Sequence, residues 1–195
     1  PAVSADETRL AAGYASVVLI DRLTKHVYPT DSPEFKTVWS DFVEHYRVHS
    51  NDATRPYDGI LELLARLEER GMKMGIVSNK LHADTDALRM KWFADFIPVA
   101  VGFSDELPKK PAPDMVYAAL EALGSSPERT LYVGDSEPDV QIAKNSGCAS
   151  VACLWGFRDQ ATLAALEPDC MARRPLDVLA ALDALNARGA SDDAA

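Results

Sequence analysis

The pattern of apolar and polar positions divides the chain into a helical first part and a longer part in which strands and helices alternate. Apolar residues recur at helical spacing over residues 5–28. They recur again over residues 33–49, after the helix-start signal Ser32-Pro33-Glu34. No strand pattern interrupts these stretches, so residues 1–53 are predicted to form a small helical domain.

Residues 54–59, Thr54-Arg-Pro-Tyr-Asp-Gly59, break this pattern and predict a hinge. Beyond them, short apolar runs alternate with amphipathic segments. The predicted strands are 72–77, 97–101, 130–133 and 150–154, and the predicted helices are 60–70, 82–93, 113–123, 138–146, 161–166 and 176–186. This alternation is typical of an α/β fold, in which a Rossmann-like parallel sheet carries helices on both faces. The fold is expected over residues 54–189, and residues 190–195 are expected to be disordered.

Composition narrows the class of partner. The 195-residue chain has a net charge of −10, which argues against nucleic acid or an anionic membrane as the main partner. No apolar run approaches the roughly 20 residues of a membrane span. The three cysteines, Cys148, Cys153 and Cys170, are unevenly spaced in apolar surroundings and are expected to be reduced in a cytoplasmic protein. The sequence leaves monomer and homodimer open.

Two carboxylates follow the apolar run 131–133. Asp135 and Asp139 are four residues apart, and Pro138 marks the start of a helix. Paired acids at the carboxyl end of a strand are suited to bind Mg²⁺ through oxygen ligands. The alternative is an ordinary strand-to-helix turn in which Asp135 caps the helix.

Two other segments place polar groups near the ends of predicted strands. Ser78 and Asn79 follow the strand 72–77 at the start of a helix, where hydroxyl, amide and backbone N–H groups suit a phosphate oxygen. Lys110 lies in a proline-rich loop, which suits a fixed positive charge over a phosphate or a nucleophilic carboxylate. The alternatives are a simple serine cap and a solvated basic loop.

His45 and His49 lie four residues apart and could face one metal ion. No third ligand is evident nearby, so a solvated helix face is the preferred interpretation.

Taken together, these segments resemble the haloacid dehalogenase superfamily, and within it the phosphoglycolate phosphatase-like branch. Ile76-Val-Ser-Asn-Lys80 is similar to the motif that binds the phosphoryl group, and Lys110-Pro-Ala-Pro-Asp114 to the motif whose lysine stabilises negative charge. Val133-Gly-Asp-Ser-Glu-Pro-Asp139 resembles the motif whose acids hold Mg²⁺, and Thr54–Gly59 and Leu154-Trp-Gly-Phe-Arg158 also resemble this branch. The resemblance implies that residues 1–53 are part of a helical cap.

The first motif of this family, Asp-x-Asp-Gly-Thr after the first core strand, is absent from the sequence. Asp21 follows an apolar run but lacks the second acid and the glycine, so we expect it to lie in a cap helix. The resemblance places the first core strand between the strand ending at Ser78 and the strand ending at Asp135. We therefore expect two unpaired strand edges and an N-terminally truncated version of a complete enzyme.

The resemblance implies a Mg²⁺-dependent phosphatase of small phosphorylated metabolites, with 2-phosphoglycolate as the first candidate substrate. The reaction would pass through an aspartyl-phosphate on an Asp that this chain lacks. Ser78 and Asn79 would bind phosphate, Ser78 and Lys110 would act in catalysis, and Asp135 and Asp139 would bind Mg²⁺. The alternatives are a dehalogenase or phosphonate hydrolase of the same superfamily, and a non-catalytic fragment or pseudoenzyme that binds phosphate or Mg²⁺.

Overall fold

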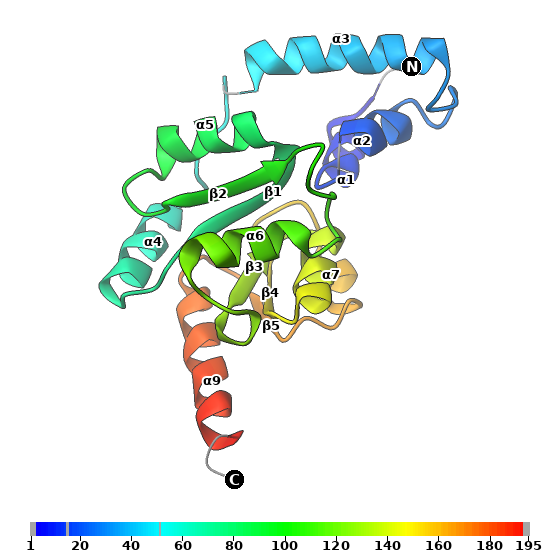
Figure 1. Cartoon of the computed structure of the whole chain (residues 1–195). Helices are drawn as coiled ribbons and strands as arrows, with labels where there is room; N and C mark the ends of the chain where they lie inside the picture. Colours follow the sequence, from blue (N-terminus) through cyan, green and yellow to red (C-terminus); the bar gives the residue numbers. More distant parts are fainter. Residues whose placement is uncertain (1–2, 15, 51, 193–195) are drawn as a thin grey trace. The chain divides into compact units, whose positions relative to one another are not determined.

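The computed structural model describes residues 3–14, 16–50 and 52–192, which form two compact units (Figure 1). Unit 1 is Pro1–Arg55 and unit 2 is Pro56–Ala195. The division falls two residues beyond the boundary predicted at residues 53 and 54. The role of unit 1 as a cap stays a prediction.

The described residues of unit 1 form three helices, α1 (Ala5–Ala11), α2 (Ser16–Leu23) and α3 (Pro33–His49). Helix α1 begins with a reciprocal capping box between Ser4 and Glu7, and α3 begins where the Ser32 hydroxyl accepts the N–H of Phe35. The predicted start and end of α3 are thus confirmed. The predicted helical stretch 5–28 is instead two short helices, because the chain leaves helical geometry after Ala11 and is extended at Ala12.

In the part of unit 2 that the structure describes, five parallel strands form two separate groups. Strand β1 (Gly75–Leu81) pairs with β2 (Val99–Phe103). In the second group the order is β3 (Leu131–Gly134), β4 (Ala149–Cys153) and β5 (Cys170–Ala172). The α/β class and the parallel strands are therefore as predicted, and β5 is a short strand that the sequence pattern did not reveal.

Helices cover both faces of these strands, as Figure 1 shows. Their bounds are α4 (Ile60–Glu69), α5 (His82–Trp92), α6 (Asp114–Leu123), α7 (Glu137–Ser146), α8 (Gln160–Ala164) and α9 (Asp177–Asp192). A short 3₁₀ turn, η1 (Pro127–Arg129), precedes β3. Helix α9 continues past its predicted end at residue 186 and includes residues 190–192, which were expected to be disordered. Residues 193–195 lie outside the described part.

The core of unit 2 consists of apolar clusters on the two faces of the strands. On one face, Val116 and Leu120 of α6 pack with Ile142 of α7 against Val77 and Tyr132. On the other face, α4 and α9 pack against β3 and β4. The cluster that they form includes Leu63 and Leu67 of α4, Val178 and Ala181 of α9, Leu131 of β3 and Val151 of β4. The alternation of side chains along β3 explains why Leu131 and Tyr132 belong to opposite clusters.

A groove of about 550 Å³ runs between β1 and β3. We call it the β1–β3 groove, and its lining includes Leu63, Leu67, Val77, Leu120, Tyr132 and Val178. Neither strand pairs with the other: among the described residues, β1 pairs only with β2, and β3 only with β4. Two strand edges therefore face this groove. That a first core strand belongs there stays a prediction.

Strand β1 differs from its predicted bounds in a way that bears on function. It begins at Gly75 and includes Ser78 and Asn79, which were expected to follow the strand at the start of a helix. The pairing of β1 with β2 is irregular between Ser78 and Leu81, and α5 begins only at His82. The expectation that backbone N–H groups at Ser78 open a helix is therefore wrong.

The three cysteines are free thiols, and Cys148 and Cys153 are buried, as the sequence indicated. Burial raises the pKa of the Cys153 thiol, which keeps it protonated at neutral pH. Among the helices of the described residues, none is both long enough and apolar enough to cross a membrane.

The packing between α6 and α7 gives a test of the core. Ile142 is completely buried, so Ile142→Ala should lower the free energy of unfolding by about 2–5 kcal/mol through lost contacts and a cavity. Leu61→Ala is the matched control, because Leu61 is 45% exposed on α4 and should change stability by less than about 1 kcal/mol. Urea denaturation of both variants measures the difference. Equal losses would contradict this description of the core.

Candidate functional site

The polar segments singled out in the sequence meet around Lys110. Its backbone N–H donates to Asn79 Oδ1 over 2.9 Å, which ties the loop before α6 to β1. Its Nζ donates to Asp139 Oδ1 over 2.7 Å, which ties the same loop to α7. Lys110 therefore connects Asn79 with Asp139. Ser78, the residue before Asn79, accepts the N–H of Lys80 through its hydroxyl.

The Lys110–Asp139 ion pair is buried, with each side chain only 9% exposed. The Tyr132 hydroxyl lies 3.4 Å from Lys110 Nζ and 3.3 Å from Asp139 Oδ1. Burial alone would lower the pKa of Lys110, but the charges and hydrogen bonds of Asp139 and Tyr132 together outweigh burial, and the pKa is raised. Burial also raises the pKa of Tyr132, so the phenol stays neutral beside the charged pair.

Asp139 is held by donors on both of its carboxylate oxygens. Lys110 and Tyr132 contact Oδ1, whereas the Ser136 hydroxyl and the N–H of Asp135 donate to Oδ2. Burial by itself would raise the pKa of Asp139, but the Lys110 charge and these hydrogen bonds lower it below the usual range. Asp139 is thus a fixed anion.

Asp135 has a different environment although it is only four residues away. Its Oδ2 accepts the N–H of Phe157 over 2.8 Å, so the loop after β4 holds this carboxylate. Burial raises the pKa of Asp135, and the nearby charge of Asp139 raises it further. The site therefore combines one carboxylate that is firmly ionised with another that takes up a proton more easily.

Two glycines make room for these acids. A Cβ atom on Gly134 would overlap the side chain of Asp139, and a Cβ atom on Gly156 would overlap the carboxylate of Asp135. Neither position has a positive φ, so the requirement for glycine here is one of space. Both glycines lie inside motifs that the sequence analysis singled out, but their contacts could not be deduced from it.

A second ion pair, in which Arg158 is buried and Glu137 is partly exposed, fixes the loop that holds Asp135. Arg158 is only 4% exposed, and its Nε donates to Glu137 Oε2 over 2.6 Å. The pair joins the end of the segment Leu154–Arg158 to the first turn of α7.

Sequence reasoning missed Glu137, Ser136 and Tyr132 as contributors to the site. Their position within or beside the motif 133–139 was the only signal available.

Other candidates from the sequence lie in unit 1 and have local partners. Asp21 lies within α2, as expected, and its Oδ2 is 2.8 Å from His26 Nδ1. The rings of His45 and His49 are 4.4 Å apart, and His49 Nδ1 is 2.8 Å from Asp52 Oδ2. In the parts of the chain that the structure describes, no group of three or more His, Cys, Asp or Glu side chains could hold a metal ion.

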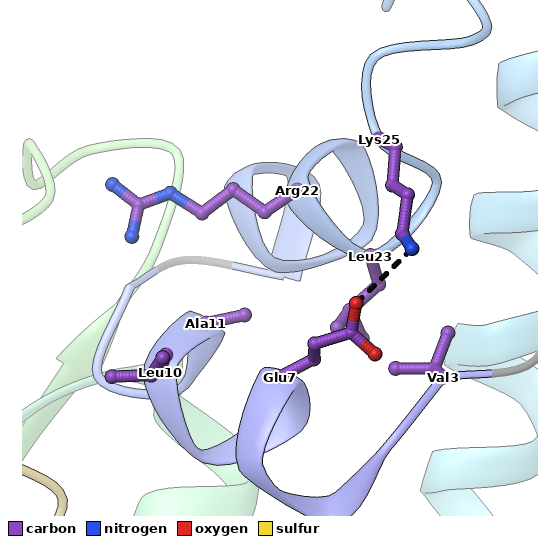
Figure 2. A pocket seen from close by; sticks show the side chains of 7 residues that line it. All are labelled: Val3, Glu7, Leu10, Ala11, Arg22, Leu23 and Lys25. Carbon is purple, nitrogen blue, oxygen red and sulfur yellow. Dashed lines mark ion pairs between the residues drawn. The ribbon is translucent and has the colours of Figure 1, made fainter.

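Unit 1 also has a pocket of about 220 Å³ between α1 and α2 (Figure 2). Glu7 and Lys25 form an exposed ion pair there, with Oε1 and Nζ 3.1 Å apart. The hydrogen bond from the Ser4 N–H is the main cause that lowers the pKa of Glu7 to about 2, and the hydrogen bond from Lys25 is the next. Arg22 points away from this pair in Figure 2, and its guanidinium lies over the ring of Tyr14. The lining is otherwise aliphatic, so the pocket offers no converging set of phosphate-binding groups.

The chemistry of the donors in unit 2 fits a magnesium ion. Mg²⁺ prefers oxygen ligands and usually takes one or two carboxylates, with water and phosphate oxygens completing its shell. Asp135 and Asp139 offer two carboxylates at neighbouring positions, and a cage of three protein ligands is not needed. With Lys110 beside them, these groups can bind a divalent cation together with an anionic oxygen.

Comparison with known proteins gives independent evidence on the family. The family model described as "Haloacid dehalogenase-like hydrolase" matches residues 11–153. The phosphoglycolate phosphatase of Aquifex aeolicus is 34% identical over 146 residues, which cover 73% of this chain and 66% of the relative. The pyrophosphatase PpaX of Bacillus mycoides is 32% identical over 139 residues, covering 71% and 65%. The chain thus spans about two thirds of the length of these relatives.

A solved structure supports the same fold. It is that of a candidate phosphoglycolate phosphatase from Lactobacillus delbrueckii subsp. bulgaricus, which matches with a TM-score of 0.86 at 26% sequence identity. The match covers 92% of this chain and 83% of the other. The arrangement of elements described above is therefore one that a known protein adopts.

The buried pair at Lys110 generates a stability prediction. Asp139→Asn leaves the Lys110 ammonium buried without its counter-ion, and it should lower the free energy of unfolding by about 3–5 kcal/mol. Asp183→Asn is the control, because Arg70–Asp183 is also a pair of a cation and an aspartate but is exposed. The control should lose less than about 1 kcal/mol. Urea denaturation at neutral pH compares the two, and a loss at Asp139 no larger than the control would refute the assigned role of this pair.

Proposed function

The chain belongs to the haloacid dehalogenase-like hydrolase family, and on that basis we propose that it is a Mg²⁺-dependent phosphatase of small phosphorylated metabolites. The observation that supports this most is the meeting of Asn79, Lys110 and Asp139 in one buried network next to Asp135. A fixed cation beside two carboxylates suits a phosphoryl group and its metal ion. The substrate proposed first is 2-phosphoglycolate.

The proposed roles follow from the contacts. Lys110 neutralises charge on the phosphoryl oxygens, and Asp139 keeps the lysine charged and in place. Ser78 and Asn79, at the end of β1, bind the phosphoryl oxygens through hydroxyl and amide groups. Asp135, together with Asp139, holds Mg²⁺, which when bound stabilises negative charge on the phosphoryl group. Because the oxygens of Asp139 already accept several donors, Asp135 is the more available ligand.

The proposed reaction also needs a nucleophile. In this mechanism an aspartate attacks the phosphorus atom, the metabolite's oxygen leaves, and water then cleaves the aspartyl-phosphate. Asp135 and Asp139 are assigned to the metal ion, and Asp21 lies within a helix of unit 1. We propose that the nucleophilic aspartate belongs to a segment outside this sequence.

The alternative to an active phosphatase is a protein that binds phosphate and Mg²⁺ without turnover. The observation that favours it is that Asp135 and Asp139 of this site are both assigned to the metal ion, which leaves no nucleophilic aspartate among the residues that the structure brings together around Lys110. A dehalogenase or phosphonate hydrolase of the same family is a further alternative. A dehalogenase needs no metal ion, so a test of whether the reaction requires Mg²⁺ distinguishes it from the proposed phosphatase.

Activity is tested by phosphate release from 2-phosphoglycolate and pyrophosphate, with the protein as its own organism makes it and with the 195-residue chain. We expect the former to release phosphate only with Mg²⁺, and Asp135→Asn to lower kcat/KM at least about 100-fold because a metal ligand is lost. Asp183→Asn should leave the rate unchanged. Undiminished activity in the Asp135 variant would exclude the assigned role.

The other outcomes separate the alternatives. Activity that resists EDTA would favour metal-free chemistry such as dehalogenation. Binding of phosphate and Mg²⁺ without turnover by the natural protein would favour the non-catalytic function.

The raised pKa of Asp135 gives a pH prediction for metal binding. A proton on Asp135 competes with Mg²⁺, so affinity should fall as the pH drops through this raised pKa. The loss should therefore begin above the pH at which an exposed aspartate, with a pKa of about 3.9, becomes protonated. Calorimetric titration of the 195-residue chain with MgCl₂ at several pH values measures the midpoint. In Asp135→Asn this pH dependence should disappear, and an unchanged midpoint in that variant would assign it to another group.

A further inference from the structure

We propose that His45 and His49 of α3 bind one divalent late transition-metal ion (Ni²⁺, Cu²⁺ or Zn²⁺), and that Asp52 holds the ring of His49 in position for it. These residues all belong to unit 1, and none of them has a role in the proposed phosphatase reaction. The inference therefore stands or falls independently of that function. Three observations support it: the approach of the two rings, the contact between His49 and Asp52, and the exposure of the side chains.

The first observation is the approach of the two imidazole rings. Residues four apart on a helix lie on the same face, one turn from each other. The ring centroids of His45 and His49 are 4.4 Å apart, and the ring planes are inclined by 32°. A metal–imidazole bond is about 2.0–2.1 Å long, so two nitrogens that share one ion are about 3–4 Å apart. A small rotation of two exposed side chains brings the ring nitrogens to this separation.

The second observation is the contact between His49 and Asp52. Nδ1 of His49 lies 2.8 Å from Oδ2 of Asp52. An ionised carboxylate only accepts hydrogen bonds, so Nδ1 carries the hydrogen, and in the neutral ring the lone pair is on Nε2. A carboxylate in this position fixes the tautomer and the orientation of a metal-binding histidine and makes its free nitrogen a better ligand. The contact thus prepares Nε2 of His49 for a metal ion.

The end of α3 explains why Asp52 is close to the ring. The helix ends at His49, and the N–H of the following residue, Ser50, donates to the Tyr46 carbonyl over 2.7 Å. The N–H of Asp52 then donates to the carbonyl of His49 over 3.2 Å. The backbone of Asp52 is therefore bonded to the same residue as its carboxylate. The contact between the two side chains follows from the fold of this turn.

The third observation, the exposure of these side chains, bears on which ion fits. The side chain of His49 is 50% exposed, and His45 is exposed as well, so water can complete the shell of an ion. Among the described residues no third His, Cys, Asp or Glu joins the pair. Two imidazoles with water oxygens suit Cu²⁺ and Ni²⁺, and imidazole is also a ligand for Zn²⁺. Mg²⁺ prefers oxygen ligands and does not suit this pair.

An anion is a less suitable occupant of the same place. Two protonated histidines could attract phosphate, but the carboxylate of Asp52 faces the ring of His49 and would repel it. The net charge of −10 also favours cations over anions near the chain. The occupant is thus a cation that prefers nitrogen ligands.

The test titrates the 195-residue chain with NiCl₂, CuCl₂ and ZnCl₂ separately by calorimetry, at pH 7.5 and in excess MgCl₂. Excess Mg²⁺ competes for sites that offer oxygen ligands alone. We expect one ion per chain, with Cu²⁺ bound most tightly of the three. Electron paramagnetic resonance of the Cu²⁺ complex should show coupling to two imidazole nitrogens. Hydrogen exchange at the amides of Ser50 and Asp52 should slow, because the ion joins the last turns of α3.

Three variants test the assigned roles. His45→Ala and His49→Ala should each weaken Cu²⁺ binding by at least about tenfold and remove one nitrogen from the resonance spectrum. Asp52→Ala should keep both nitrogens but weaken binding by about tenfold, which is the usual effect of losing the partner of a metal-binding histidine. All three side chains are exposed, so the fold should be unchanged, and circular dichroism checks this.

His26 provides the matched control. Its Nδ1 also lies 2.8 Å from an aspartate, Oδ2 of Asp21, and its side chain is exposed. No second histidine lies within four residues of it in the sequence. His26→Ala should therefore leave the affinity and the resonance spectrum unchanged.

Several results would overturn the proposal. Absence of saturable binding of all three ions would show that the histidine pair is only a solvated helix face. Undiminished binding by the double variant His45→Ala/His49→Ala would place the ion elsewhere, and an equal loss in His26→Ala would show nonspecific binding to exposed imidazoles. An unchanged affinity in Asp52→Ala would remove the role of the carboxylate. If a variant did not fold, the number of nitrogens coupled to Cu²⁺ in the unmodified chain would still decide the question.

Discussion

The buried ion pair between Lys110 and Asp139 is the interaction on which the arrangement of unit 2 depends. In the described part of the chain, the β1–β2 and β3–β4–β5 groups share no strand pairing, so other contacts must hold them in position. Lys110 provides one, because its backbone binds Asn79 of β1 and its side chain binds Asp139 of α7. The α6–α7 cluster provides the other by packing against Val77 and Tyr132 together. The contacts of Lys110 and the packing of the apolar cluster thus hold the two groups of strands together, as hydrogen bonds between strands usually do within a sheet.

This arrangement explains why the two acids of one motif differ in their protonation. Asp139 is surrounded by donors and a cation, whereas Asp135 relies on one N–H from the loop after β4 and is exposed to the charge of Asp139. Burial affects both acids, but only Asp139 has enough compensation to lower its pKa. Two carboxylates four residues apart therefore differ in character: Asp139 is a fixed anion, and Asp135 takes up a proton more easily.

Much of the fold could be predicted from the sequence, because strong signals marked the elements. Ser32 and Pro33 marked the start of α3, and the alternation of elements indicated parallel strands. Short or irregular elements were not predictable in this way. Strand β5 has only three residues, and the irregular pairing after Ser78 extends β1 beyond its apolar run. At the site, the motifs identified the acids and the lysine, but Tyr132 and the Arg158–Glu137 pair required knowledge of which segments meet in space.

The close contact between Gly156 and Asp135 limits which residue types can occur together at these two positions in related sequences. The carboxylate of Asp135 occupies the volume that a side chain at residue 156 would fill, although the two positions are far apart along the chain. Natural variation at the two positions should therefore be linked. A homologue that keeps the acid but carries a larger residue in place of this glycine must direct its carboxylate elsewhere. The residue at 156 can thus sort family members by the geometry of the acid before any of their structures is known.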